Sequence, residues 1–342
     1  MKVYFGAYQA IMMLKGGPRT QMFETKKELE KLGVDVELFN AWKTLRKGDC
    51  DLVHLFAADI STFHFAREIS KIGIKLVVSP IFFTRHSTNY IKSVMFFNRL
   101  LLNKSRGVWT DYGFVSQICN WADAVLPNTA AEAFLIEKGL GIPISKIHIV
   151  PNGVNEKFYN ADPSLFIKTY GISNFILNVG HIGPGRKNVL RLIRALSRID
   201  KPAVIIGRME AGRELDLIHK DAGKNILLLD NISNDSEILA SAYAACDVFA
   251  LPSLFETPGI AALEAGLAGA KIVITKYGGT EEYFKAYAEY VEPTSVDSIA
   301  EGIKKSIAKP KDKKLSEHIK DNYLWGKVGE MTLDAYKSIL SD

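Results

Sequence analysis

The sequence has little cysteine, no long apolar run and no strong excess of either charge. Its three cysteines lie far apart and form no Cys-x-x-Cys pair, which excludes a disulfide framework and a zinc site of the usual spacing. No apolar run reaches the roughly 18 residues that a membrane-spanning helix needs. A net charge of +5 over 342 residues is too small to indicate nucleic-acid binding.

Two further signals are missing near the N-terminus. Residues 1–14 carry no cleavage site of small residues, so we expect no signal peptide and a cytoplasmic location. The loop after the first expected strand lacks the Gly-x-Gly-x-x-Gly motif, which counts against an NAD-dependent enzyme.

Strand-like and helix-like segments alternate along almost the whole chain. Helical patterns include 18–32, with Pro18 at its start and Gly33 at its end, and 129–139. Expected strands lie at 2–8, 34–39, 51–56, 74–81, 123–127 and 147–150, and, after the turn sequence Pro-Asn-Gly at 151–153, at 175–180, 203–207, 225–229, 247–251 and 271–275. This alternation predicts parallel sheets with crossover helices.

The break near residue 153 divides the chain into two expected α/β domains. We place the first at 1–155 and the second at 156–324, with a last helix at about 325–342 that packs back on the first. Ligands of open parallel sheets bind beyond the carboxyl ends of the strands, so the loops after strands are the places to search for a site.

Three such loops carry residues suited to an anionic sugar nucleotide. Gly16 and Gly17 precede a helix, whose N-terminal N–H groups attract phosphate, although the pair is also compatible with a plain turn. Arg186 and Lys187 lie in the second loop, 179–188. The N-terminus of a helix carries positive potential, so two cations just before it are unfavourably placed. A diphosphate ligand would account for their position.

The third loop and its helix carry two carboxylates. Glu256 follows a strand, and Glu264 lies in the apolar run IAALEAGLA, an unusual setting for a merely solvated residue. Because a carboxylate accepts two O–H donors at once, the pair is suited to sugar and ribose hydroxyls.

Together these residues resemble the retaining family 4 glycosyltransferases. The resemblance rests on the Glu-x7-Glu spacing, on EAGLAGAKIVIT after it, and on GGPRT, ADAVLPNTA and VPNGVNEKFY earlier in the chain. It implies the GT-B fold, in which two Rossmann-like domains with parallel sheets face each other across a cleft. It also implies transfer of a hexose from a UDP- or GDP-sugar to a glycan or glycolipid hydroxyl, in surface polysaccharide synthesis.

The resemblance further implies roles for individual residues. Glu264 is expected to bind the ribose, Glu256 the donor sugar, and Arg186 and Lys187 the diphosphate. Thr257, Pro258, Gly259 and Ile260 are expected around the donor sugar or phosphate, and Gly16 and Gly17 near the phosphate. The chain departs from the family where members often carry Glu-Gly-Phe-Gly, since residues 256–259 read Glu-Thr-Pro-Gly.

Several alternatives stay open at this point. His86 and His54 are candidates for the acceptor side, each with a structural or surface role as the rival interpretation. Residues 81–114, with Arg85, Lys92, Arg99, Lys104 and Arg106, are compatible either with packing or with contact to an anionic membrane on its cytoplasmic face.

We expect no essential metal, because the Asp-x-Asp pattern at 49–51 precedes a strand instead of following one. Rival functions are a nucleotide-sugar 2-epimerase and a sugar-nucleotide-binding protein without catalysis.

Overall fold

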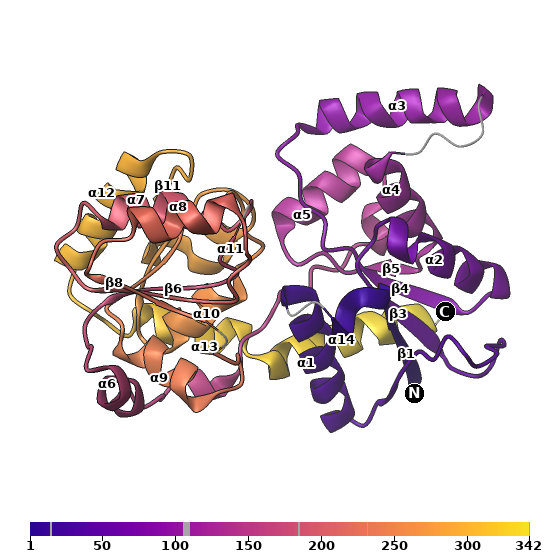
Figure 1. The fold of residues 1–342 in the computed structure, drawn as a ribbon. Coiled ribbons are helices and arrows are strands. Elements are labelled where there is room, and N and C mark those ends of the chain that lie inside the picture. The colour runs from indigo at the N-terminus through magenta and orange to yellow at the C-terminus, as the bar shows by residue number, and fades with distance from the viewer. Residues whose placement is uncertain (14–15, 105–109, 184, 231, 342) are drawn as a thin grey trace. The chain divides into compact units, whose positions relative to one another are not determined.

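A computed structural model describes residues 1–13, 16–104, 110–183, 185–230 and 232–341. At 100–104 it describes the backbone alone. The chain divides into two compact units. Unit 1 comprises Met1–Gly153 and Trp325–Asp342, and unit 2 comprises Val154–Leu324. Each unit is a parallel sheet with helices on both faces (Figure 1). This arrangement confirms the predicted fold class.

The sheet of unit 1 has the order β2-β1-β3-β4-β5, with every pairing parallel. One face packs on α2 and α4, and the other on α1 and α14. Its strands are β1 Lys2–Ala7, β2 Asp35–Leu38, β3 Leu52–Phe56, β4 Lys75–Ser79 and β5 Ala124–Val125. Its longer helices are α1 Gly17–Lys31, α2 Ile60–Ile72, α3 Thr88–Lys104, α4 Asp111–Trp121 and α14 Trp325–Leu340. Its shorter turns are η1 Gln9–Met12, α5 Ala130–Phe134, the π-helical η2 Leu135–Gly139 and η3 Ile144–Lys146.

The sheet of unit 2 has the order β11-β10-β9-β6-β7-β8 and is also parallel. Helices α7, α8 and α12 cover one face, and α6, α9, α10 and α13 cover the other (Figure 1). Its strands are β6 Ile176–Val179, β7 Ala203–Ile206, β8 Ile226–Leu229, β9 Val248–Leu251, β10 Lys271–Thr275 and β11 Ala288–Val291. Its helices are η4 Glu156–Phe158, α6 Ser164–Tyr170, α7 Val189–Leu196, α8 Arg213–Asp221, α9 Glu237–Ala245, α10 Ile260–Leu267, α11 Thr280–Phe284, η5 Lys285–Tyr287, α12 Val296–Ala308 and α13 Lys314–Tyr323.

Two details differ from the sequence-based expectations. The strand expected at 147–150 is wrong, since of these residues only Ile147 makes a bridge, to Val125. The strand β11 was not expected, because its four residues are mostly half-buried at the sheet edge and give a weak apolar signal. Within the described part of the chain, no helix has the length and hydropathy to cross a membrane.

Candidate donor site in unit 2 and its counterparts in unit 1

The strand order of unit 2 brings two loops together. Strands β6 and β9 are neighbours, while the chain runs outward from them in opposite directions along the sheet. This reversal is a topological switch point, where the loops after the two strands part and leave room for a ligand. The loop after β6 carries Arg186 and Lys187, and the loop after β9 carries Glu256.

The three side chains form one ion-pair cluster. Lys187 Nζ donates to Glu256 Oε1 over 2.6 Å, and Arg186 Nη1 lies 3.1 Å from Oε2. Arg186 also donates to the carbonyl oxygen of Phe255 over 3.1 Å. The exposed fractions of the side chains are 5% for Glu256, 23% for Lys187 and 42% for Arg186. The carboxylate is therefore inside and the cations face outward.

This cluster fixes the protonation state of Glu256. Burial alone would raise the pKa of the carboxyl group, but Lys187 and Arg186 outweigh it and lower the pKa to about 2. Glu256 is therefore an anion at neutral pH and has no proton to donate.

The loop after β10 holds the backbone of Glu256. Glu256 N–H donates to the carbonyl oxygen of Tyr277 over 3.1 Å, and Gly279 N–H donates to the carbonyl oxygen of Glu256 over 3.0 Å. Gly278 has φ +102°, and a Cβ there would overlap the same carbonyl oxygen. Only glycine is compatible with this approach, so Gly278 is part of the site although its sequence resembles a plain turn.

Asn188 anchors the other loop. Its side-chain amide donates to the carbonyl oxygens of Pro252 and Pro293, over 2.8 and 2.7 Å. Its backbone is left-handed, with φ 58°, immediately before α7. These bonds tie the loop after β6 to the loops after β9 and β11, and the bond to Pro252 keeps Lys187 within reach of Glu256.

Helix α10 begins directly after the cluster. Thr257 and Pro258 lead to Gly259, which has φ +85° and precedes the first helical residue, Ile260. The N–H groups of Gly259 and Ile260 thus lie at a helix N-terminus, where positive potential attracts anions. Pro258 has no N–H to offer.

Glu264 lies one turn further along α10 and has a fixed partner. The hydroxyl group of Tyr243, on α9, donates to Glu264 Oε2 over 2.7 Å. Burial, and then the nearby carboxylate, raises the pKa of Tyr243 well above its usual value, so the hydroxyl stays protonated and donates. Tyr243 therefore orients Glu264, and nothing in its apolar helix pattern indicates this role.

In unit 1, Gly16 and Gly17 lie at the N-terminus of α1, after β1. The neighbours of β1 are β2 and β3, so this is the switch point of the first sheet. Pro18 is the second helical residue, as expected of a helix start.

His54 has the surroundings of a structural residue. It is buried in β3, where Nδ1 pairs with the hydroxyl of Tyr336 at 2.6 Å and Nε2 with the hydroxyl of Ser79 at 2.9 Å. Burial lowers its pKa to about 3, so the ring is neutral. Both ring nitrogens are occupied inside the core, which favours the structural role over the acceptor-side one.

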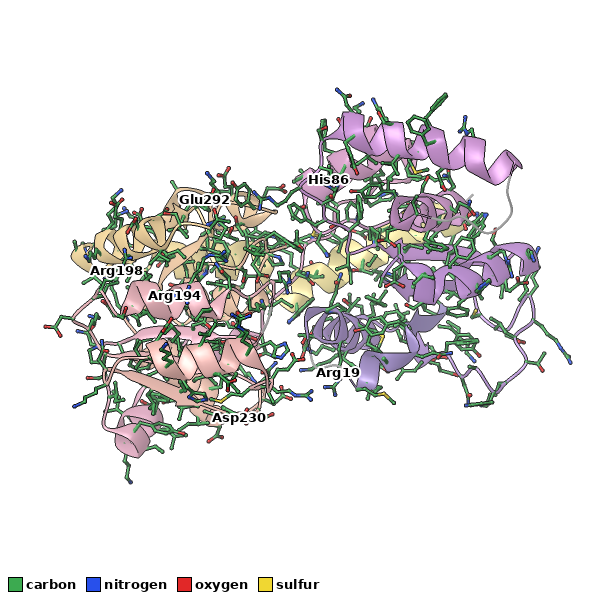
Figure 2. All side chains as sticks on the ribbon, turned by 45° about the horizontal axis from the view of Figure 1, so that its top comes forward. Arg19, His86, Arg194, Arg198, Asp230 and Glu292 are labelled. Carbon is green, nitrogen blue, oxygen red and sulfur yellow. The ribbon has the colours of Figure 1, made fainter. Side chains whose placement is uncertain are left out.

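His86 is exposed on the loop before α3 (Figure 2). Its Nδ1 lies 2.7 Å from the hydroxyl of Tyr112, which also lies 2.9 Å from Thr84 Oγ1. The loop follows β4, at the carboxyl edge of the sheet, so His86 keeps a position open to a ligand of unit 1.

A buried carboxylate that the sequence did not single out joins two loops of unit 1. Glu132 accepts the backbone N–H of Phe82 over 2.6 Å and that of Asn128 over 2.7 Å. These loops follow β4 and β5, so Glu132 shapes the carboxyl edge of this sheet.

The two aspartates of the Asp-x-Asp pattern accept backbone hydrogen bonds. Asp49 accepts the N–H of Arg46 over 2.8 Å, and Asp51 accepts the N–H of Lys2 over 2.7 Å. Across the described ranges, no three His, Cys, Asp or Glu side chains gather where they could hold a metal ion.

Known structures share the fold over the whole chain. Sucrose-phosphate synthase from Thermosynechococcus elongatus has a TM-score of 0.78 at 15% identity, with 100% of this chain and 99% of that chain covered. Anabaena HepE, solved in complex with UDP, has a TM-score of 0.72 at 16% identity, with 99% and 100% covered. Two parallel α/β units of this kind define the GT-B fold of glycosyltransferases.

Sequence comparison identifies the family. The model of "Glycosyl transferases group 1" matches residues 167–323, and that of "Glycosyltransferase Family 4" matches 37–158. The chain belongs to these family 4 glycosyltransferases, which confirms the resemblance.

Two curated relatives have a higher sequence identity but match less of the chain. An uncharacterized glycosyltransferase of Methanocaldococcus jannaschii is 28% identical over 57% of this chain and 55% of its own length. The MMP alpha-(1->4)-mannosyltransferase of Mycolicibacterium hassiacum is 22% identical over 86% of this chain and 72% of its own. The chain thus spans only about half of the first of these relatives.

Proposed function

We propose that this chain transfers a hexose from a nucleotide-diphosphate sugar to a hydroxyl group of a glycan or glycolipid, with retention of configuration. The observation that carries the proposal is the buried Glu256 between Lys187 and Arg186 at the switch point of unit 2. The same loop continues into the helix that presents Glu264.

Arg186 and Lys187 are proposed to hold the diphosphate. Two cations and one carboxylate leave one net positive charge, which favours an anionic ligand. The cations are partly exposed, so a phosphate can bind them from the solvent side without displacing Glu256 from its buried position. Because charge grows on the departing phosphate, these contacts strengthen in the transition state.

Glu256 is proposed to accept hydroxyl groups of the donor sugar. With a pKa of about 2 it cannot act as a general acid, so departure of the nucleotide depends on the cations and on the N–H groups of Gly259 and Ile260. Thr257 and Pro258 form the adjoining backbone, and the N–H groups at Gly16 and Gly17 are proposed as a further phosphate contact.

Glu264 is proposed to accept the two ribose hydroxyls. A vicinal diol presents two O–H donors in a fixed spacing, and one carboxylate can receive both. Tyr243 holds Glu264 by a single hydrogen bond, which fixes the side-chain orientation before the ligand arrives.

The reaction follows from these roles. The bond between the anomeric carbon and the diphosphate oxygen breaks, and the electron pair stays on the diphosphate. The acceptor oxygen then forms a bond to the anomeric carbon on the same face, and its proton passes to the departing phosphate. No protein base and no metal ion is required, and EDTA should leave turnover unchanged.

The donor base and the acceptor belong to the same proposal. HepE was solved with UDP and glucose, and D-inositol 3-phosphate glycosyltransferases are relatives, one of Paenarthrobacter aurescens at 26% identity. We propose UDP or GDP as the carrier, and a cytoplasmic role in surface polysaccharide synthesis. His86 is proposed to face the acceptor.

The test is a thermal-shift series with UDP, GDP, ADP and NAD. At about 100 times its dissociation constant, a ligand should stabilise unit 2 by roughly 2.7 kcal/mol. We expect a response to UDP or GDP that is lost in Glu264→Ala and kept in Glu301→Ala, an exposed control on α12.

The responding nucleotide then decides which donor sugars are screened with a mixed pool of glycan acceptors. A glycosylated product with retained anomeric configuration supports transfer. Release of a 2-epimer without acceptor would identify an epimerase instead, and a response to NAD alone would refute the proposal.

A further inference from the structure

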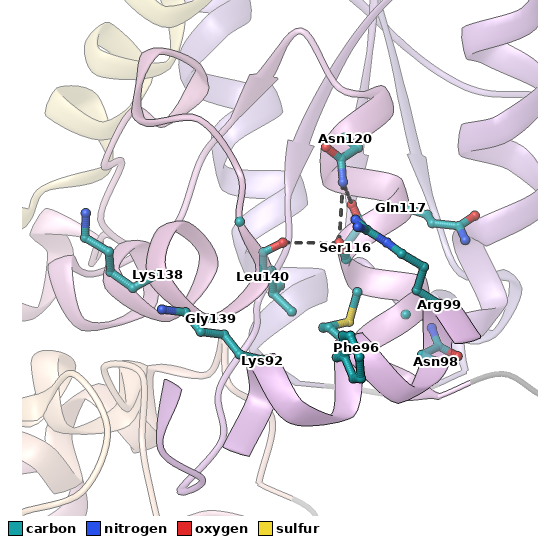
Figure 3. A pocket seen from close by; sticks show the side chains of 13 residues that line it. Lys92, Phe96, Asn98, Arg99, Ser116, Gln117, Asn120, Lys138, Gly139 and Leu140 are labelled. Atoms are coloured by element: carbon teal, nitrogen blue, oxygen red, sulfur yellow. Dashed lines mark hydrogen bonds between the residues drawn. The ribbon is translucent and has the colours of Figure 1, made fainter. Parts of the chain in front are cut away.

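Unit 1 contains a pocket that the donor site does not explain. It has a volume of about 560 Å³ and lies between α3, α4 and the turn at 138–141 (Figure 3). All of its lining residues belong to unit 1, whereas the cations and carboxylates of the donor site belong to unit 2.

The charge of this pocket has one sign. Lys92 and Arg99 on α3 line it, and neither has an ion-pair partner among the described residues; Lys138 lines it as well, paired with Glu137. No acidic side chain within the described ranges lines the pocket. In Figure 3 Arg99 extends toward α4, while Lys92 and Lys138 lie at the other end. An anionic ligand is therefore favoured.

The wall between these cations is built of amides. Asn98 is 2% exposed, and its Oδ1 is fully enclosed and has no hydrogen-bond partner among the described residues. Gly113 makes room for it, since a Cβ there would clash with Asn98 Nδ2. Gln117, on α4, adds a second amide to the lining. A buried amide is rarely left without partners, and a ligand in the pocket would give Asn98 Nδ2 an acceptor.

An aromatic ring completes the lining. Phe96 is 62% exposed although it is large and apolar. Amides both donate and accept hydrogen bonds, as sugar hydroxyl groups do, and an aromatic ring covers the apolar face of a sugar. A phosphate group alone would use mainly the cations and leave the amide carbonyl of Gln117 without a donor.

We infer that this pocket binds an acidic saccharide, a sugar that bears a carboxylate or phosphate group. Arg99 and Lys92 hold its acidic groups, the Gln117 amide and Asn98 Nδ2 hold its hydroxyl groups, and Phe96 covers one ring face. The inference goes beyond the proposed function, because this binding needs no nucleotide donor. It also differs from docking on an anionic membrane, which needs cations and apolar residues but no buried amide.

The test is calorimetric titration of the full chain without nucleotide. The probes are trigalacturonic acid, glucose 6-phosphate and the neutral maltotriose, with flotation on phosphatidylglycerol vesicles as a separate arm. We expect the two acidic sugars to bind and maltotriose to bind at least about tenfold more weakly, since it lacks charge-assisted bonds. Comparison of the two acidic probes tells whether the carboxylate or the phosphate is preferred.

Three variants test the assigned contacts. Arg99→Glu should weaken acidic-sugar binding by at least about tenfold, whereas Lys43→Glu, a matched charge change at an exposed site of unit 1, should leave it unchanged. Phe96→Ala should weaken it roughly 2- to 10-fold. Asn98→Leu should weaken binding while leaving the folded protein at least as stable, because it removes an amide without a partner.

The contrary results are equally clear. Equal affinity for acidic and neutral sugars, or full binding by Arg99→Glu, would overturn the inference. So would flotation that depends on Arg99 together with no binding of either acidic sugar, which would assign the surface to membrane contact. The UDP or GDP response of Arg99→Glu should stay intact, so failure of the donor site and failure of this pocket are told apart.

Discussion

Glu256 in unit 2 and Glu132 in unit 1 are both buried carboxylates beside the carboxyl ends of parallel strands. Their partners differ. Glu132 accepts two backbone N–H groups, from Phe82 and Asn128, whereas Glu256 is bound by the side chains of Lys187 and Arg186. Backbone N–H groups stay where the fold puts them, while long, partly exposed cations can turn toward a ligand. The kind of partner, more than the degree of burial, therefore separates the structural carboxylate Glu132 from Glu256 in the candidate donor site.

The largest expected effect concerns Glu132, the structural carboxylate. Glu132→Ala leaves two buried N–H groups without an acceptor and should reduce the free energy of unfolding by roughly 2–6 kcal/mol, measured by urea denaturation. The control Glu137→Ala, in the same helical segment, should change it by less than about 0.5 kcal/mol. A loss below about 1 kcal/mol in Glu132→Ala would show that Glu132 does not join the two loops.

The second largest effect is expected at the two cations that bind Glu256. Lys187→Ala and Arg186→Ala should each lower turnover by about 10²- to 10³-fold, because each removes a positive charge that we propose stabilises the departing diphosphate. Steady-state kinetics measures this, with Lys220→Ala, exposed on α8, as the control. If both variants kept full turnover, the diphosphate would have to bind elsewhere.

The third prediction concerns acid stability in unit 1. The pKa of His54 is lowered by burial from 6.5 to about 3, so below pH 6.5 the unfolded chain takes up a proton that the folded chain refuses. Above pH 6.5 the burial of neutral His54 does not reduce the free energy of unfolding. As the pH falls below 6.5, this free energy decreases, by about 2 kcal/mol at pH 5.

His54→Gln removes this titration, so its stability should fall less between pH 7 and pH 5 than that of the wild type. His64→Gln, at an exposed site on α2, should keep the wild-type slope. Equal slopes in wild type and His54→Gln would mean that His54 is not held neutral.

The smallest effect is expected at Tyr243, which donates a hydrogen bond to Glu264. Tyr243→Phe removes one hydrogen bond to Glu264 and should weaken nucleotide binding roughly 2- to 10-fold, with turnover at saturating donor nearly unchanged. Calorimetry and kinetics together check this split. A fall in turnover at unchanged affinity would place Tyr243 in the chemical step instead.

The local sequence pattern was sufficient to predict most strands and the bounds of α1. Apolar runs, Pro18 and Gly33 determine the conformation of the residues next to them, so their effect can be predicted without the tertiary structure. It failed at 147–150, where β5 offers only a two-residue edge to pair with.

The residues of the candidate site show the same limit. The sequence singled out Glu256, Lys187 and Glu264, but not the ion pair across 69 positions or the bond from Tyr243 across 21. Such contacts depend on strand order, which no local pattern contains. Gly278 has the sequence surroundings of a turn, because the carbonyl group for which it makes room is also distant in sequence.

Helix α14 has a consequence for how the protein is made. It packs against α1, and its Tyr336 pairs with His54, 282 positions earlier in the chain. On the ribosome, unit 2 is synthesised completely before this helix appears, so the half that is translated first is the half that finishes folding last. A premature stop codon after Leu324 would therefore spare the whole of unit 2 and damage the opposite end of the polypeptide.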